Sequence, residues 1–188
     1  MRKLGVFNFV TLNGFYKGPG NDISWHRHGG EESSFSEEGV QSGGILLFGR
    51  VTYEMMEAFW PTEDAKKAFP VVADGMNKSE KIVFSNTLKK ADWNNTKIVS
   101  GDIAETVKKM KQQSGKDMTI LGSGSIVSLL TDHGLIDHYQ VMVDPVALGK
   151  GTPMFNDISQ PLQLELVATR IFKSGVILLT YQPQTDTI

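Results

Sequence analysis

The chain has 188 residues, of which 40% are hydrophobic, and a formal net charge of −2. This length and composition suit one globular domain over residues 1–188, and the near-neutral charge argues against a nucleic-acid surface, which needs clustered Lys and Arg. The chain contains no cysteine, which excludes disulfides, thiolate catalysis and Cys-based zinc sites and fits a cytoplasmic location.

The first strand is predicted over residues 4–12, which are apolar on both faces. Three N-terminal residues, Met1-Arg2-Lys3, followed by this apolar run mimic a signal peptide, but the run is short, contains Asn8 and precedes no small-residue cleavage site. No stretch approaches the ~20 apolar residues of a membrane span, so we expect no membrane partner. Residues 13–30 are polar and glycine-rich, and we expect a long surface loop there.

The middle of the chain alternates strands with helices. We expect helices at 31–41, 51–59, 64–76, 102–113 and 126–131, the third interrupted by Pro70. We expect strands at 44–48, 81–84, 97–99, 118–121 and 139–146. The clearest helix is 102–113, because Ile103, Val107 and Met110 fall on one stripe and Asp102 is a suitable cap.

The end of the chain has a different pattern. Apolar Leu162, Leu164, Leu166 and Ala168 alternate with polar residues, which predicts a half-exposed strand over 162–169. The turn 173–175 then leads into a strand over 176–181, giving a hairpin. The sequence therefore predicts a three-layer α/β/α domain whose mixed, mostly parallel sheet ends in a C-terminal antiparallel hairpin.

Two glycine turns share one layout, in which a buried strand is followed by glycine and a helix start. The first is Gly49-Arg50-Val51-Thr52 and the second is Gly122-Ser123-Gly124-Ser125. A helix N-terminus offers free N–H groups and partial positive charge, glycine allows close approach, and Arg50 could grip a phosphate. Each turn alone could equally be a tight connection, and Val127 breaks the dinucleotide fingerprint. Together, at neighbouring strand ends, the turns would converge on one crevice.

Three further polar groups have weaker signals. Ser85-Asn86 could take a phosphate or ribose oxygen, although an ordinary turn is the favoured interpretation. Asn13-Gly14 is a turn signal, and its glycine could also lie under a flat ring. One of the first helix's acids, Glu31, Glu32, Glu37 and Glu38, could donate or orient a proton, but a solvated acidic face at a helix start explains them better.

A metal site is not expected. His26, His28 and Glu31 have tempting spacing, but no clean third or fourth ligand follows, and His133 and His138 are interpreted as structural. Neither a Gly-x-Ser-x-Gly elbow nor a Walker loop is present.

Five motifs in a fixed order connect these features. They are Thr11-Leu12-Asn13-Gly14, the block from Ile45 to Met56 with Gly-Arg-x-Thr-Tyr-Glu, Ile120 to Ser125, Ile136-Asp137-His138-Tyr139, and Pro145 to Phe155 with Pro-x-x-Leu-Gly-x-Gly. In this order they resemble the dihydrofolate-reductase-like superfamily. Within it, the chain is most similar to stand-alone relatives of the reductase domain of the bifunctional riboflavin-biosynthesis deaminase-reductase.

The resemblance implies an NADPH-dependent oxidoreductase and a homodimer. It implies that Gly49, Arg50 and Thr52 bind cofactor phosphates and that Ser85 and Asn86 take the 2′-phosphate side. It further implies that Gly122, Ser123, Gly124 and Ser125 hold the pyrophosphate, while Val10, Thr11 and Gly14 face the nicotinamide. Asn86 replaces an expected basic residue, which leaves the preference for NADPH over NADH open.

The substrate side is less well defined. We expect Trp25, His26, Glu31, Glu32 and Phe35 to line it and Asn13 to hydrogen-bond a small molecule, although Asn13 replaces the Asp of many relatives and an amide is no general acid. The leading hypothesis is hydride transfer from NADPH to a small, pyrimidine- or pteridine-like substrate. The alternatives are a catalytically weakened NADP(H)-binding protein and a true dihydrofolate reductase.

Overall fold

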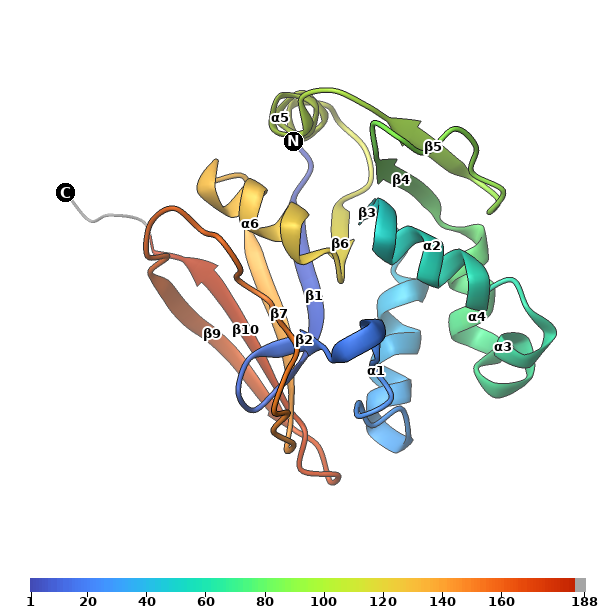
Figure 1. Ribbon diagram of the computed structural model, residues 1–188, viewed down its shortest axis with the longest axis vertical. Coiled ribbons are helices and arrows are strands. Elements are labelled where there is room, and N and C mark those ends of the chain that lie inside the picture. The colour runs from blue at the N-terminus through green and yellow to red at the C-terminus, as the bar shows by residue number, and fades with distance from the viewer. Residues whose placement is uncertain (185–188) are drawn as a thin grey trace.

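The computed structural model describes residues 1–184 as a twisted sheet between two layers of helices (Figure 1). Eight strands lie in the order β5-β4-β3-β6-β1-β7-β10-β9. A small second sheet pairs β2 with β8. The strands are β1 (Leu4–Thr11), β2 (Phe15–Lys17), β3 (Ile45–Gly49), β4 (Glu80–Phe84), β5 (Thr96–Val99), β6 (Met118–Leu121), β7 (His138–Asp144), β8 (Thr152–Pro153), β9 (Leu164–Ile171) and β10 (Ile177–Pro183).

The helices cover both faces of the sheet. They are η1 (Pro19–Asn21), α1 (Gly30–Gln41), α2 (Arg50–Phe59), α3 (Glu63–Ala68), α4 (Pro70–Lys78), α5 (Ile103–Gln112) and α6 (Gly124–Asp132). Alternate residues of each strand face opposite sides, so Leu47 packs under α5 and α6, whereas Phe48 packs with α2 and α4. A third apolar cluster joins α1 to β1, β7 and β10.

Strand direction follows the predicted pattern. The strands from β5 to β7 pair in parallel, and β10 and β9 add the antiparallel hairpin. The predicted α/β fold, with its mixed, mostly parallel sheet and terminal hairpin, is therefore confirmed. Asp102 caps α5 as predicted, its carboxylate accepting the N–H of Glu105 at 2.9 Å.

The prediction of a plain surface loop over residues 13–30 is wrong in part. The segment contains β2, which pairs with β8, and the turn η1. It also buries His26 against the sheet. Its polar composition conceals these contacts because its partners lie more than a hundred residues away in sequence.

Two boundaries also differ from prediction. The helix expected at 64–76 is two helices, α3 and α4, that meet at Phe69, with Pro70 in the first turn of α4. The edge strand β9 is exposed along most of its length, so Leu166 and Ala168 do not form the predicted buried face. No further element of residues 1–184 covers this edge.

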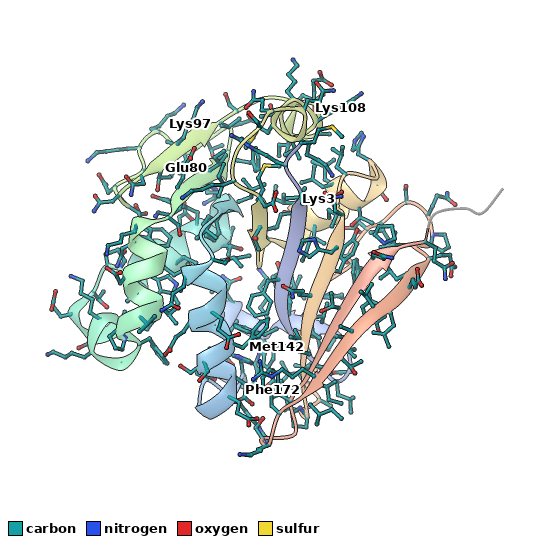
Figure 2. The ribbon with its side chains drawn as sticks, turned by 180° about the vertical axis from the view of Figure 1, so that it is seen from behind. Lys3, Glu80, Lys97, Lys108, Met142 and Phe172 are labelled. Atoms are coloured by element: carbon teal, nitrogen blue, oxygen red, sulfur yellow. The ribbon has the colours of Figure 1, made fainter. Side chains whose placement is uncertain are left out.

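The parallel strands all point their carboxyl ends to one edge of the sheet. Figure 2 shows Lys3 and Glu80, at the amino ends of β1 and β4, at the opposite end of the molecule from Met142 and Phe172. Both glycine turns, the end of β1 and the start of α1 therefore belong to the carboxyl edge, where open α/β sheets bind their ligands.

Candidate functional site

The two glycine turns are joined directly by hydrogen bonds. They follow β3 and β6, which are neighbours in the sheet. The N–H of Gly49 donates to Oγ of Ser123 at 3.0 Å, and the N–H of Ser123 donates to Oγ1 of Thr52 at 3.1 Å. Ser123 adopts a left-handed conformation with φ 54°. This junction places the N-termini of α2 and α6 beside each other, and neither helix has a side-chain cap.

Packing explains why glycine is present at these turns. A Cβ on Gly122 would lie 2.8 Å from Cγ2 of Thr52, and one on Gly124 would lie 2.8 Å from Cε1 of Tyr16. Both distances are shorter than real contacts, so the junction accepts only glycine without movement. The buried Asn8 of β1 holds the turn from below by donating to the carbonyl oxygen of Gly122 at 3.2 Å.

Two side chains expected at the cofactor phosphates are thus used inside the protein. Thr52 and Ser123 are buried and bind the junction itself. Ser125 is exposed on the first turn of α6. Arg50 is also exposed and forms an ion pair with Glu54 at 2.9 Å on the same helix. The groups that face outward at the junction are therefore Arg50, Ser125 and the helix N-termini.

Ser85 and Asn86 form a turn after β4. The Ser85 hydroxyl accepts the N–H groups of Thr87 and Leu88, and Oδ1 of Asn86 accepts the N–H of Gly101. Both side chains lie at the same sheet edge as the glycine junction, two strands from β6. Their hydrogen bonds shape the turn, as an ordinary-turn interpretation requires.

The end of β1 is tied to the loop that follows β7. Asn13 donates from Nδ2 to the carbonyl oxygen of Leu148 at 2.8 Å and accepts the N–H of Leu148 at 3.2 Å. Thr11 is buried and its hydroxyl donates to Oδ1 of Asn13 at 2.9 Å. Val10 is buried beside them, and Gly14 has φ 84° with open space around it. The Asn13 amide therefore holds two loops together, whereas the surface at Gly14 is free.

A buried His–Asp pair joins the segment before α1 to the end of β7. Nδ1 of His26 is 2.7 Å from Oδ2 of Asp144, and the side chains of the two residues are 2% and 1% exposed. The imidazole stacks on Phe9, with ring centroids 3.5 Å apart and planes inclined by 12°. The other oxygen of Asp144 accepts the N–H of Arg27 at 3.0 Å. Asp144 is aligned with Thr11 in the β1–β7 register, so the pair lies at the end of β1.

Asp144 was not among the residues predicted for the site. Its signal is an acidic residue that ends a buried apolar strand, because Asp is rarely buried without a partner. His26 was expected to line the substrate side, but nothing local indicates that Asp144, 118 residues away, would be its partner.

His28 packs edge-on against His26, with ring centroids 4.4 Å apart, and against Phe9 and Phe69. The residue as a whole is exposed, and its ring lies beside these aromatic neighbours. Desolvation, followed by repulsion from His26, lowers the pKa of His28 to about 4, although Asp144 acts in the opposite direction. His28 is therefore neutral at physiological pH.

The start of α1 meets the β9–β10 turn at a shallow cleft of about 620 Å³, lined in part by Arg27, Glu31, Glu32 and Lys173. Glu31 accepts the N–H of Lys173 at 3.1 Å, and the buried Glu32 accepts the hydroxyl of Ser174.

Two aromatic residues complete this side of the molecule. Phe35 packs between Phe7 and Phe172 beneath α1. Trp25 is half-buried and donates to the carbonyl oxygen of Asp22 at 3.1 Å. Of the expected substrate-side residues, Glu31 and Glu32 thus line the cleft, whereas His26 is buried against Asp144 and Phe35 belongs to the packing below α1.

Residues 1–184 contain neither a cluster of metal ligands nor a membrane-spanning helix. No group of three or more His, Asp or Glu side chains is placed to hold a metal ion. Among the same residues, no helix has the length and apolar character needed to cross a bilayer. What this end of the sheet does offer is a phosphate-compatible junction after β3 and β6 and a buried His–Asp pair at the end of β7.

The sheet order, the helix layers and the terminal hairpin define a dihydrofolate-reductase-like α/β domain. Within this fold, residues 2–178 match the family model of the RibD C-terminal domain, and the chain belongs to that family.

Known proteins agree with this assignment. The chain is 30% identical over 172 residues to the uncharacterized protein YyaP of Bacillus subtilis, covering 92% of this chain and 90% of YyaP. It resembles the deaminase/5-amino-6-(5-phosphoribosylamino)uracil reductase of Thermotoga maritima, with a TM-score of 0.69, 14% identity and coverage of 97% of this chain and 57% of that one. It also resembles Enterococcus faecalis dihydrofolate reductase complexed with NADP(H), with a TM-score of 0.64, 17% identity and 97% coverage of both chains.

Proposed function

We propose that the protein is an NADPH-dependent oxidoreductase that transfers a hydride to a small, pyrimidine- or pteridine-like substrate. The observation that carries this proposal is the hydrogen-bonded junction of the two glycine turns, which presents two uncapped helix N-termini at one sheet edge. Such ends bind phosphate through backbone N–H groups and the helix dipole. Family membership and a neighbour that binds NADP(H) support the same cofactor.

The residues present fit this cofactor, because the junction provides N–H groups, an exposed guanidinium and an exposed hydroxyl. Arg50 would exchange Glu54 for a phosphate, and the starts of α2 and α6 would hold the pyrophosphate. The turn at Ser85 and Asn86 would take the adenosine side, and the end of β1 at Thr11 and Gly14 would face the nicotinamide. The bound cofactor supplies the hydride; the protein supplies orientation and charge compensation.

Cofactor binding tests this proposal. We expect NADPH fluorescence to change on titration with the protein, and Arg50→Ala to weaken NADPH binding roughly tenfold, because one charge-assisted hydrogen bond is lost. Glu54→Gln is the matched control: it removes the competing carboxylate, so affinity should hold or rise. Absence of binding at high micromolar NADPH would refute the cofactor assignment.

Turnover separates the activity from its alternatives. Oxidation of NADPH with 5-amino-6-(5-phosphoribosylamino)uracil supports the reductase, whereas oxidation with 7,8-dihydrofolate alone supports a true dihydrofolate reductase. The weakened-binder alternative rests on Asn13, whose amide is engaged by Leu148 and offers no acid. NADPH binding without turnover of either compound supports that alternative.

We also propose that two copies associate through β9. This strand forms the edge of the sheet within residues 1–184, and its side chains Leu166, Val167 and Ile171 are 50%, 55% and 75% exposed. Apolar side chains on an uncovered edge strand favour pairing with another chain, and closed two-fold dimers are the commonest outcome for identical chains.

A further inference from the structure

The pair formed by His26 and Asp144 carries an inference that rests on the proposed function and deepens it. We propose that His26 is the proton donor of the reduction and that Asp144 is its positioning residue. The observations are the depth of the pair, its geometry and its place at the end of β1.

Burial is the first argument. Polar and charged side chains are costly to bury unless they are hydrogen-bonded or paired, and here both side chains of the pair are at most 2% exposed. Asp144 uses one oxygen for Nδ1 of His26 and the other for the N–H of Arg27. A carboxylate bonded in this way fixes the orientation of an imidazole, as it does in catalytic triads.

The ring geometry is the second argument. Phe9 stacks on one face of His26, and His28 stands perpendicular to it at 4.4 Å. Nδ1 is engaged by Asp144, and Nε2 forms none of the hydrogen bonds found within residues 1–184. His26 can therefore exchange a proton through Nε2 without losing its bond to Asp144.

The position of the pair is the third argument. Asp144 is the register partner of Thr11. Phe9, on which His26 stacks, directly precedes the buried Val10 in β1. The proposed function places the nicotinamide at this end of β1. A proton donor at this position would lie beside the substrate nitrogen or oxygen, which becomes basic when the carbon bonded to it receives a hydride.

A hydride would leave a C–H bond of the reduced nicotinamide with its electron pair and add to the carbon of a substrate C=N or C=O bond, while the π electrons move to nitrogen or oxygen. That atom takes the proton from Nε2 of the His26 imidazolium, which becomes neutral imidazole. The substrate is reduced, the nicotinamide is oxidised, and His26 regains its proton from solvent.

The charged surroundings of His26 are few. Asp144 of β7 faces it directly, and His28 of its own segment is neutral because its pKa is lowered. Glu32 of α1 and the guanidinium of Arg27 are each bonded to Ser174 of the β9–β10 turn. Asp144 is thus the acidic group bonded to the ring.

The first experiment needs no substrate. Nitrogen-15-labelled histidine reports on the four histidines, and His26→Gln assigns the His26 signals. We expect added NADPH to shift the Nε2 resonance of His26 but not that of His133, which lies at the exposed end of α6. If fluorescence shows NADPH binding and the His26 resonance does not move, the inference is overturned and the proposed function survives. If NADPH does not bind, the proposed function fails first.

The second experiment uses turnover of 5-amino-6-(5-phosphoribosylamino)uracil or 7,8-dihydrofolate. His26→Gln keeps an N–H for Asp144 and should fold, yet kcat should fall by about 10²- to 10⁴-fold, with NADPH affinity changed less than about threefold. The alkaline limb of the wild-type pH–rate profile should disappear. Asp144→Asn should lower kcat and move that limb to lower pH, with partial recovery in Asp144→Glu. An unchanged profile in His26→Gln would overturn the inference.

Discussion

At the scale of single residues, one of the two hydroxyls in the glycine junction, that of Thr52, can be tested separately. Thr52 is buried and its Oγ1 accepts the N–H of Ser123, which has a left-handed conformation. Thr52→Val keeps the side-chain shape but leaves that N–H without its acceptor, so we expect a loss of about 1–3 kcal/mol in the free energy of unfolding, measured in urea. Ser125→Ala, on the exposed face of the same turn, should stay within about 0.5 kcal/mol of wild type. Equal stability of the two variants would contradict the assigned role.

His28 predicts a second residue-scale effect, on pH dependence. Its pKa is about 4 in the folded chain against an ordinary 6.5, so between these values the unfolded chain binds the extra proton. Stability should therefore fall as pH decreases from about 6.5 to about 4. His28→Gln removes this contribution, and the urea midpoint should drop less between pH 7 and pH 5 than in wild type. The same drop in His28→Gln and wild type would show that other groups cause the acid sensitivity, and His133→Gln is the matched control.

At the scale of elements, Gly124 is fixed by its contact with β2. A Cβ there would lie 2.8 Å from the Tyr16 ring, so Gly124→Ala should destabilise the protein by about 1–3 kcal/mol through overpacking. In a Tyr16→Ala background the same substitution should cost much less, since the opposing ring is gone. A double-mutant cycle on unfolding free energies measures this coupling. Additive effects would mean that α6 and β2 do not constrain each other.

Most elements were predictable because their signals are local. Buried apolar runs gave β1, β3 and β6 within a residue or two, and Asp102 marked the start of α5. The predictions for β2 and β9 were wrong for physical reasons. β2 has three half-buried residues and pairs with a strand more than a hundred residues later. β9 alternates like a half-buried strand, but its burial depends on what lies beside the sheet.

At the scale of the whole molecule, parallel topology made part of the site predictable. Because β3 and β6 end at one edge, Gly49 and Gly122 could be placed together from sequence. The hydrogen bonds of Thr52 and Ser123 within the junction could not be predicted, because the sequence does not distinguish a hydroxyl that binds phosphate from one that binds the backbone. The pairing of His26 with Asp144 also depends on long-range folding of a polar segment onto β7. The sequence therefore predicted which end of the sheet carries the site, whereas the side chains that remain free there could be identified only from the folded structure.

The proposed association of two chains is testable at the same scale. Light scattering should give a mass twice the 20.7 kDa of one chain. The double variant Leu166→Lys with Val167→Lys places two charges on the exposed edge of β9, where burial against a partner would be strongly unfavourable, and it should run as a monomer. Phe59→Lys is the control, because Phe59 is similarly apolar and 41% exposed but lies at the end of α2. A wild-type monomer, or a β9 variant that stays dimeric, would exclude β9 as the interface.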